Sequence, residues 1–263
     1  MNHAKSIQLL ALVNHIIAIA GCIYFPEYIV YGLLAWGLVN IFSTNIAIHR
    51  FMAHRSFSTT PIKTKILKYL TVISAFGSPL SWTAMHRYHH MYSGSDQDNE
   101  SPDRIGYIRA WLTLYDPIKV PKTMIKDILK DKDYMFITKH YWILLFTWII
   151  TLYSIDPMLG IFGFSFPAAC IYQAAGAFGV IPHCKYFGYI VIKPNKDCTA
   201  VNSPLTSLIS WGEGWHNYHH TRSKDHRHGH KWWEIDPPAF FIEQLFLTGD
   251  HKHDVQETKK QTS

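Results

Sequence analysis

The sequence predicts an all-α integral membrane protein with four transmembrane helices and a cytoplasmic helical cap carrying a histidine-rich di-metal site. Three observations support this class. Three charge-free runs, and a fourth that is extended across Lys139, are long enough to cross a bilayer. Lys and Arg gather on one side of these runs, and histidines cluster next to their ends. Charged residues make up 17% of the chain, below the roughly 25% of soluble domains. We therefore expect residues 1–263 to form one membrane domain, and the runs exclude a soluble or nucleic-acid-binding protein despite the net charge of +6.

The first two runs predict a helical hairpin. No charged residue lies between Lys5 and Glu27, so residues 6–26 can cross the ~30 Å hydrocarbon core at about 1.5 Å per residue. Residues 28–48 form a second charge-free run. The connection around Pro26 is short, so we expect the two helices to be antiparallel.

The remaining runs differ in what they predict. Residues 69–85 are uncharged, but a crossing there would place the first and second histidine clusters on opposite sides of the membrane. We therefore expect an interfacial helix over 69–85, broken around residues 77–79 by glycine and proline. Residues 137–155 and 158–182 complete the four spans, and the Gly and Ala content of the last one favours close helix packing.

The basic residues orient the spans. One Lys precedes the first span, 14 Lys and Arg lie in residues 49–139, and 10 follow residue 183. The two turns on the opposite side carry only Glu27 and Asp156 as charged residues. Basic residues favour the cytoplasmic side, so both termini and all the histidine clusters are expected there. Residues 252–263 are expected to be a disordered tail.

Three histidine clusters predict a metal centre, because neutral imidazole is the commonest metal ligand among side chains. Two clusters have i, i+3, i+4 spacing, which places three rings on one helix face, and one has i, i+5 spacing, which predicts a helix end or a local distortion. The count exceeds the four ligands of a tetrahedral zinc site and favours two metal ions with five or six ligands each. The nine candidate ligands are His49, His54, His86, His89, His90, His183, His216, His219 and His220.

Carboxylates near the clusters are candidates to orient these rings, since metal-ligating histidines usually donate their second N–H to a carboxylate or a carbonyl. The position of Glu213 three residues before His216 favours this role. Asp96, Asp98 and Glu100 are equally compatible with a solvated surface.

Basic residues and further histidines surround the third cluster. The basic side chains suit either an anionic carrier group on a substrate or anionic lipid headgroups. The histidines alternate in a polar loop that contains glycine and are expected on the surface. The two sets are Lys185, Arg222, Lys224 and Lys231, and His226, His228 and His230.

The clusters resemble the histidine boxes of the membrane fatty acid desaturases, closest to the acyl-CoA Δ9 (stearoyl-CoA-like) branch. The matching motifs are His49-x-x-x-x-His54, His86-Arg-x-His89-His90 and Gly212-Glu-Gly-Trp-His216-Asn-Tyr-His219-His220. Residues 227–236 look like the tail of bacterial members, so a bacterial inner membrane is expected rather than the endoplasmic reticulum. The likeness runs from about residue 28 to 247.

The resemblance implies that the nine histidines bind two iron ions. It also implies insertion of a cis double bond, at Δ9, into a fatty acyl chain with O₂ as co-substrate and two electrons. The acyl-CoA branch has an Asn where this chain has Gly179, one turn before His183.

The resemblance also implies partners. The substrate is a fatty acyl chain carried as a CoA or acyl carrier protein thioester, or as membrane lipid. The chain has no His-Pro-Gly-Gly haem motif, and its four cysteines are scattered, so a separate electron donor such as ferredoxin or cytochrome b5 is expected. Trp82, Trp211 and Trp215 are candidates to line an acyl tunnel, and Leu33 to set its depth.

Two other functions compete with desaturation. A related di-iron fatty acyl hydroxylase or acetylenase would share the histidine boxes and differ in the tunnel. A metal-binding membrane transporter or sensor would place its ligands inside the spans, whereas these histidines lie at one membrane face.

Overall fold

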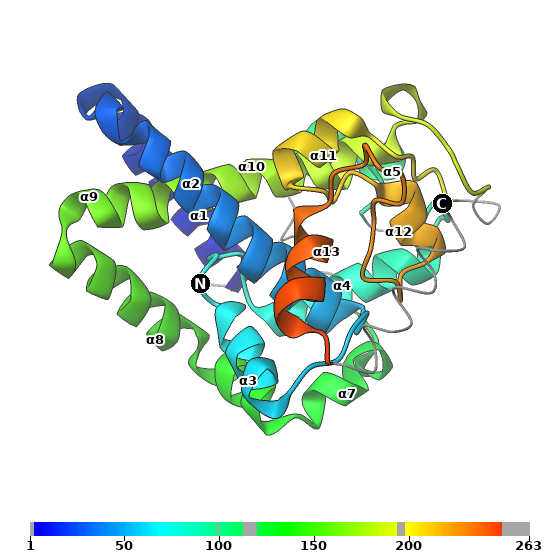
Figure 1. The fold of residues 1–263 in the computed structure, drawn as a ribbon, viewed down its shortest axis with the longest axis horizontal. Coiled ribbons are helices and arrows are strands. Elements are labelled where there is room, and N and C mark those ends of the chain that lie inside the picture. Colours follow the sequence, from blue (N-terminus) through cyan, green and yellow to red (C-terminus); the bar gives the residue numbers. More distant parts are fainter. Residues whose placement is uncertain (1–2, 99, 113–119, 194–197, 249–263) are drawn as a thin grey trace.

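The computed structural model describes residues 3–98, 100–112, 120–193 and 198–248, so the expected tail at 252–263 lies outside the described residues. The described chain is helical, and its only extended pairings are two isolated bridges that join Tyr189 to Asn202 and Asn202 to Trp215. Figure 1 shows long helices on one side of the molecule and a cap of short helices on the other. The predicted all-α class is confirmed.

Four helices in the described residues are long and apolar enough to cross a membrane. They cover Lys5–Tyr24, Pro26–Ala53, Lys132–Ile155 and Pro157–His183. The first span belongs to α1 (His3–Tyr24), and the third is α8 (Lys132–Ile155). The second span consists of η1 (Pro26–Tyr28), α2 (Ile29–Val39) and η2 (Asn40–Ala53). The fourth span consists of α9 (Pro157–Gly160), η4 (Ile161–Ser165), α10 (Phe166–Val180) and η5 (Ile181–His183). Buried side chains from all four pack together in one core that includes Ile7, Ile48, Leu145 and Ile171.

The second span ends in a π-helix. Residues Asn40–Ala53 have π-helical geometry, and the backbone N–H of His54 donates to the carbonyl of His49, 3.1 Å away. π-helices are usually single turns and often mark functional sites. The wider turn lets histidines five residues apart face the same region, with ring centroids 4.8 Å apart. The distortion predicted from the i, i+5 spacing is therefore confirmed.

The interfacial helix expected over residues 69–85 is not one helix. Helix α3 (Pro61–Leu70) ends near its start, and α4 (Pro79–Tyr92) begins only at the proline. The connection includes left-handed backbone at Ala75 and Gly77, which a helix cannot contain. Proline at the first helical position lacks only an N–H that would be unpaired anyway, so it starts α4.

The cap is built from short helices that cover the ends of the spans nearest the histidines. Helix α4 packs against η2 and α8, α11 (Pro204–Ser210) packs against α10, and α13 (Pro237–Phe241) packs against η2. The second histidine cluster lies on α4 and the third on α12 (His216–Thr221). Ring contacts place His86 beside His49 at the end of η2, and His216 beside His183 at the end of the fourth span. The other elements of the cap are α5 (Pro102–Ile105), α6 (Tyr107–Leu112), η3 (Lys122–Ile125), α7 (Lys126–Leu129), η6 (Lys185–Phe187) and η7 (Ile242–Phe246).

Candidate metal centre

The nine predicted histidines converge in two adjacent groups. Within each group, one ring nitrogen per histidine lies within 4.8 Å of the others. Seven of the nine rings are buried, and His90 and His220 are half-buried. The first group is His49, His54, His86, His90 and His219, and the second group is His89, His183, His216 and His220.

The ring nitrogens of each group face one another. In the first group the Nε2 atoms of His54 and His86 lie 2.7 Å apart, and His219 Nε2 lies 2.8 Å from that of His90. In the second group His216 Nε2 lies 3.0 Å from that of His183 and 2.9 Å from that of His220. A neutral imidazole has one N–H donor and one acceptor nitrogen. Several Nε2 atoms that converge on one point therefore cannot all find a hydrogen-bond partner among themselves. A cation at the centre of each group fits this donor set.

The environment keeps six of these rings neutral, as metal ligation requires. Burial, followed by repulsion from neighbouring histidines, places the pKa of six rings well below the ordinary histidine value. These six are His54, His86, His90, His216, His219 and His220.

Asp98 orients a ring of the second group. Its carboxylate is 1% exposed and lies 3.0 Å from the Nδ1 of His89, so the Nε2 of that ring points to the other histidines. Burial opposes ionisation of Asp98, but the His89 contact and the backbone N–H groups of Gly94 and Glu100 hold its pKa below the ordinary value. Burial instead raises the pKa of Glu100, and Asp96 is exposed. Asp98 thus occupies the predicted orienting position, and Asp96 does not.

Glu213 orients a ring of the first group and belongs to a buried charge network. Its Oε2 accepts from His49 Nδ1, and its Oε1 accepts from the Nη2 of Arg50 at 2.8 Å. Arg50 also lies within 3.0 Å of Asp236 and donates to the carbonyl of His226. Burial opposes ionisation of Glu213, but Arg50 holds its pKa well below the ordinary value. Arg50 was not singled out from the sequence, because its partner Asp236 lies far along the chain.

His228 is also part of this region, so its expected place on the surface is wrong. The ring is 1% exposed, its Nδ1 lies 3.3 Å from Glu213 Oε2, and its centroid lies 4.4 Å from that of His219. Burial lowers the pKa of His228 to about 4. His226 is buried as well, whereas His230 is exposed as expected. The loop turns inward because Asp236 accepts the backbone N–H groups of His228 and Gly229.

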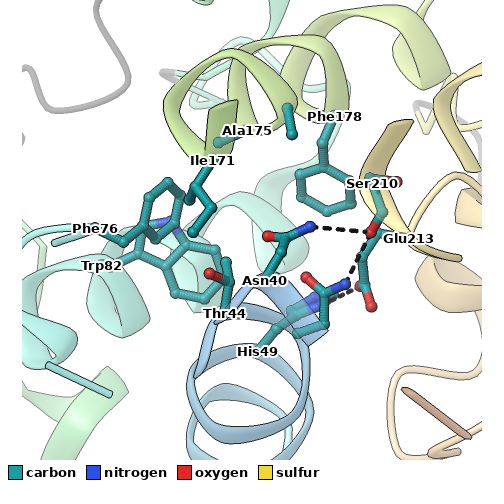
Figure 2. Close-up of a pocket in the computed structure, with 12 residues that line it drawn as sticks. Asn40, Thr44, His49, Phe76, Trp82, Ile171, Ala175, Phe178, Ser210 and Glu213 are labelled. Carbon is teal, nitrogen blue, oxygen red and sulfur yellow. Dashed lines mark hydrogen bonds and ion pairs between the residues drawn. The ribbon is translucent and has the colours of Figure 1, made fainter. Parts of the chain in front are cut away.

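A narrow cavity of about 30 Å³ lies beside the first group. Figure 2 shows Asn40, Thr44 and His49 along one helix, facing Ile171, Ala175 and Phe178 of α10. At one end the amides of Asn40 and Asn45 donate to the carbonyl of Ser210.

The cavity tests the tunnel residues expected from the sequence. Trp82 lines the cavity and stacks on His86 with centroids 4.5 Å apart. Trp211 packs against Trp36 and Trp215 against Trp233, and neither lines this cavity. Leu33 is 45% exposed on α2, so the expectation that it sets the depth of this cavity is wrong.

Comparison with known proteins identifies the family. Residues 26–236 match the profile of the fatty acid desaturases. The chain is 28% identical to an sn-1 stearoyl-lipid 9-desaturase of Anabaena variabilis, over 83% of this chain and 80% of the relative. It is 27% identical to an icosanoyl-CoA 5-desaturase of Limnanthes douglasii, over 90% of this chain and 68% of the relative. It is 28% identical to Delta-9 acyl-lipid desaturase 1 of Arabidopsis thaliana, over 78% of this chain and 68% of the relative.

With its four apolar spans and its histidine groups beside an apolar cavity, the chain belongs to the fatty acid desaturase family and is a membrane oxidoreductase that introduces double bonds into fatty acyl chains.

Proposed function

We propose that this chain inserts a cis double bond, at Δ9, into a fatty acyl chain by using O₂ and two electrons at a di-iron centre. The observation that carries this proposal is the pair of histidine groups, with five and four converging rings, next to a narrow cavity with an apolar lining. The nine histidines would hold the two ions, five in the first group and four in the second. Gly179 has no side chain where the acyl-CoA branch has an Asn, so one of the two irons would lack that contact.

Two bound irons would supply the O₂-dependent oxidation of an unactivated C–H bond, which side-chain acid–base chemistry cannot perform. The protein supplies position and shelter. Glu213 and Asp98 fix the orientation of one ring in each group. Trp82 and Phe178 flank the cavity beside His49 and exclude water from an acyl chain bound there.

The partners and the setting are part of the proposal. The relatives' names describe action on acyl-lipid and acyl-CoA substrates, and we propose a CoA or acyl carrier protein thioester, or a lipid acyl chain, for this enzyme. A separate ferredoxin or cytochrome b5 would deliver the electrons. Residues 1–263 would form a single domain in the bacterial inner membrane, with the termini and the histidines on the cytoplasmic side, where the basic residues are concentrated.

Expression in a host that lacks its own desaturase tests this function. We expect new monounsaturated chains in the fatty-acid profile, with the double-bond position read by mass spectrometry, and no such chains with His89→Ala. The matched control is His140→Ala, because His140 belongs to neither group. Hydroxylated or triple-bonded products would assign the chain to the related oxidases, and an unchanged profile with both metal ions bound would exclude the substrate class offered by the host.

The role of Asp98 can be tested by a single amide substitution. Asp98→Asn keeps the shape of the side chain but weakens the acceptor for His89 Nδ1–H. Loss of such a supporting contact costs roughly 10–100-fold in metal affinity or activity. Asp96→Asn, two residues away and exposed, should leave both unchanged. Equal behaviour of the two variants, measured by metal titration and product formation, would show that Asp98 does not orient the ring.

A further inference from the structure

Helix α11 in the cap has its polar side chains inside and its apolar side chains outside. Leu205 and Leu208 are 55% and 76% exposed, whereas Thr206, Ser207 and Ser210 are buried. A surface helix of a soluble protein has the opposite arrangement, with its apolar stripe facing the core. Polar groups turned inward and leucines turned outward are what a lipid environment requires.

The position of α11 agrees with that environment. It packs beside α10, as Figure 1 shows, and Trp211 at its end packs on α2. The Trp211 ring comes within 2.9 Å of where a Cβ of Gly37 would lie. Gly37 follows Pro26, the first residue of its span, by 11 residues. At about 1.5 Å per residue this is roughly 16 Å into a hydrocarbon core of ~30 Å. The end of α11 therefore lies at the depth of the hydrocarbon core, in the half of the membrane that is nearest the histidines.

The same reversal continues in the loop before α13. Trp232 and Ile235 are 95% and 73% exposed, whereas Glu234 between them is 4% exposed. The Glu234 carboxylate accepts from the Tyr189 hydroxyl and from the backbone N–H groups of His230 and Lys231. The polar side chain is thus used internally, and the large apolar side chains face outward.

These segments adjoin one another. Tyr189 bridges to Asn202, two residues before α11, and its ring lies 6.0 Å from that of Trp233. We call the exposed apolar side chains of these adjoining segments the cap face. Its exposed members are Tyr186, Phe187, Ile190, Leu205, Leu208, Trp232 and Ile235.

Two lysines lie over aromatic rings of the segments that carry the cap face. Lys231 Nζ lies 5.0 Å from the ring centroid of Tyr189 and 5.2 Å from that of Trp233. Lys185 Nζ lies 5.3 Å from the ring centroid of Tyr186. Aromatic rings and lysines beside an apolar surface are typical of the membrane headgroup layer, where the lysines meet anionic phosphates.

We propose that the cap face inserts into the headgroup layer of the bilayer beside α10, with Lys185 and Lys231 contacting the phosphates of anionic lipids. The cap is then bound to the membrane by its own surface as well as by the four spans. This inference goes beyond the proposed function, because it involves neither the metal ions nor the acyl substrate.

Fluorescence quenching of Trp232 in the full chain tests the proposal. The protein is placed in nanodiscs of phosphatidylcholine and phosphatidylglycerol, with and without bromine on the upper acyl carbons, and iodide is titrated from the water. The signal of Trp232 is the difference between the wild type and Trp232→Phe. This substitution removes little internal packing, since Trp232 is 95% exposed. Trp148→Phe reports an indole within the third span, and Trp215→Phe reports a buried one.

We expect the Trp232 signal to resemble that of Trp148, quenched by brominated lipid and protected from iodide. Quenching by iodide with no effect of brominated lipid would overturn the proposal, since the face would then contact water. Protection from both quenchers, as for Trp215, would also overturn it, because a protein partner or a second copy would then cover the face. None of these outcomes depends on metal binding or on catalysis, so the result is independent of the proposed function.

Discussion

Replacing Arg50 with alanine is expected to destabilise the folded protein by about 3–5 kcal/mol, the cost of breaking a buried ion pair by removing one partner. Arg50 is 0% exposed and carries the only guanidinium that the described residues place against both Glu213 and Asp236. Without it, two buried carboxylates lose their counter-charge. One of them orients His49, so the first histidine group should also lose affinity for its metal ion. Thermal unfolding in detergent, with metal content measured in parallel, gives both quantities.

Arg55 provides the matched control. It lies five residues further along the same segment, its side chain is 58% exposed, and it pairs with Asp127. An exposed ion pair contributes roughly 0–1 kcal/mol, so Arg55→Ala should unfold nearly as the wild type does. Arg50→Lys should restore the protein only in part, because a lysine cannot form the paired contacts of the guanidinium fork. If Arg50→Ala unfolded like Arg55→Ala, the buried network would not stabilise the site.

Replacing His216 with alanine is expected to lower the metal content from two ions to one per chain and to abolish product formation. The second group has four histidines, and His216 Nε2 lies within 3.0 Å of two of them, so its loss leaves three scattered donors. The five histidines of the first group stay in place. The loss of activity should exceed the ~10–100-fold effect of removing a supporting carboxylate. Elemental analysis and fatty-acid profiling measure the two effects.

His230→Ala is the control for His216→Ala, because His230 is exposed and belongs to neither group. It should retain both metal ions and full activity. A His216→Ala protein that retained two ions and made product at the normal rate would exclude His216 as a ligand.

The features that could be predicted from the sequence are those encoded locally. A long charge-free run predicts a transmembrane helix from its own residues. The i, i+3, i+4 spacing places three histidine rings on one face of α4 or α12, whatever the position of that helix in the fold. The i, i+5 spacing of His49 and His54 predicted a distortion, which the π-helical turn provides. The nine histidines meet because the first cluster and His183 lie at the ends of spans. The rings on α4 and α12 contact them there, His86 against His49 and His216 against His183.

The features that could not be predicted depend on contacts between distant residues. Arg50 and Asp236 are separated by 186 positions, and only the fold brings them together. His228 is buried because Asp236 draws its loop inward, although the Gly-containing polar segment favours a surface position. The helix expected over 69–85 is interrupted over a longer stretch than expected, because α3 ends at Leu70 and the left-handed backbone at Ala75 prevents a helix from resuming before Pro79. Leu33 faces outward because the periodicity of an all-apolar helix does not identify its inner face.

The most direct test of the di-iron proposal is the metal content of the purified full-length chain expressed with ample iron, combined with X-ray absorption at the iron edge. The proposal predicts two iron ions per chain with nitrogen and oxygen neighbours and no sulfur, since none of the four cysteines belongs to either histidine group. Fewer than two ions per chain, a different metal, or sulfur in the coordination shell would contradict it.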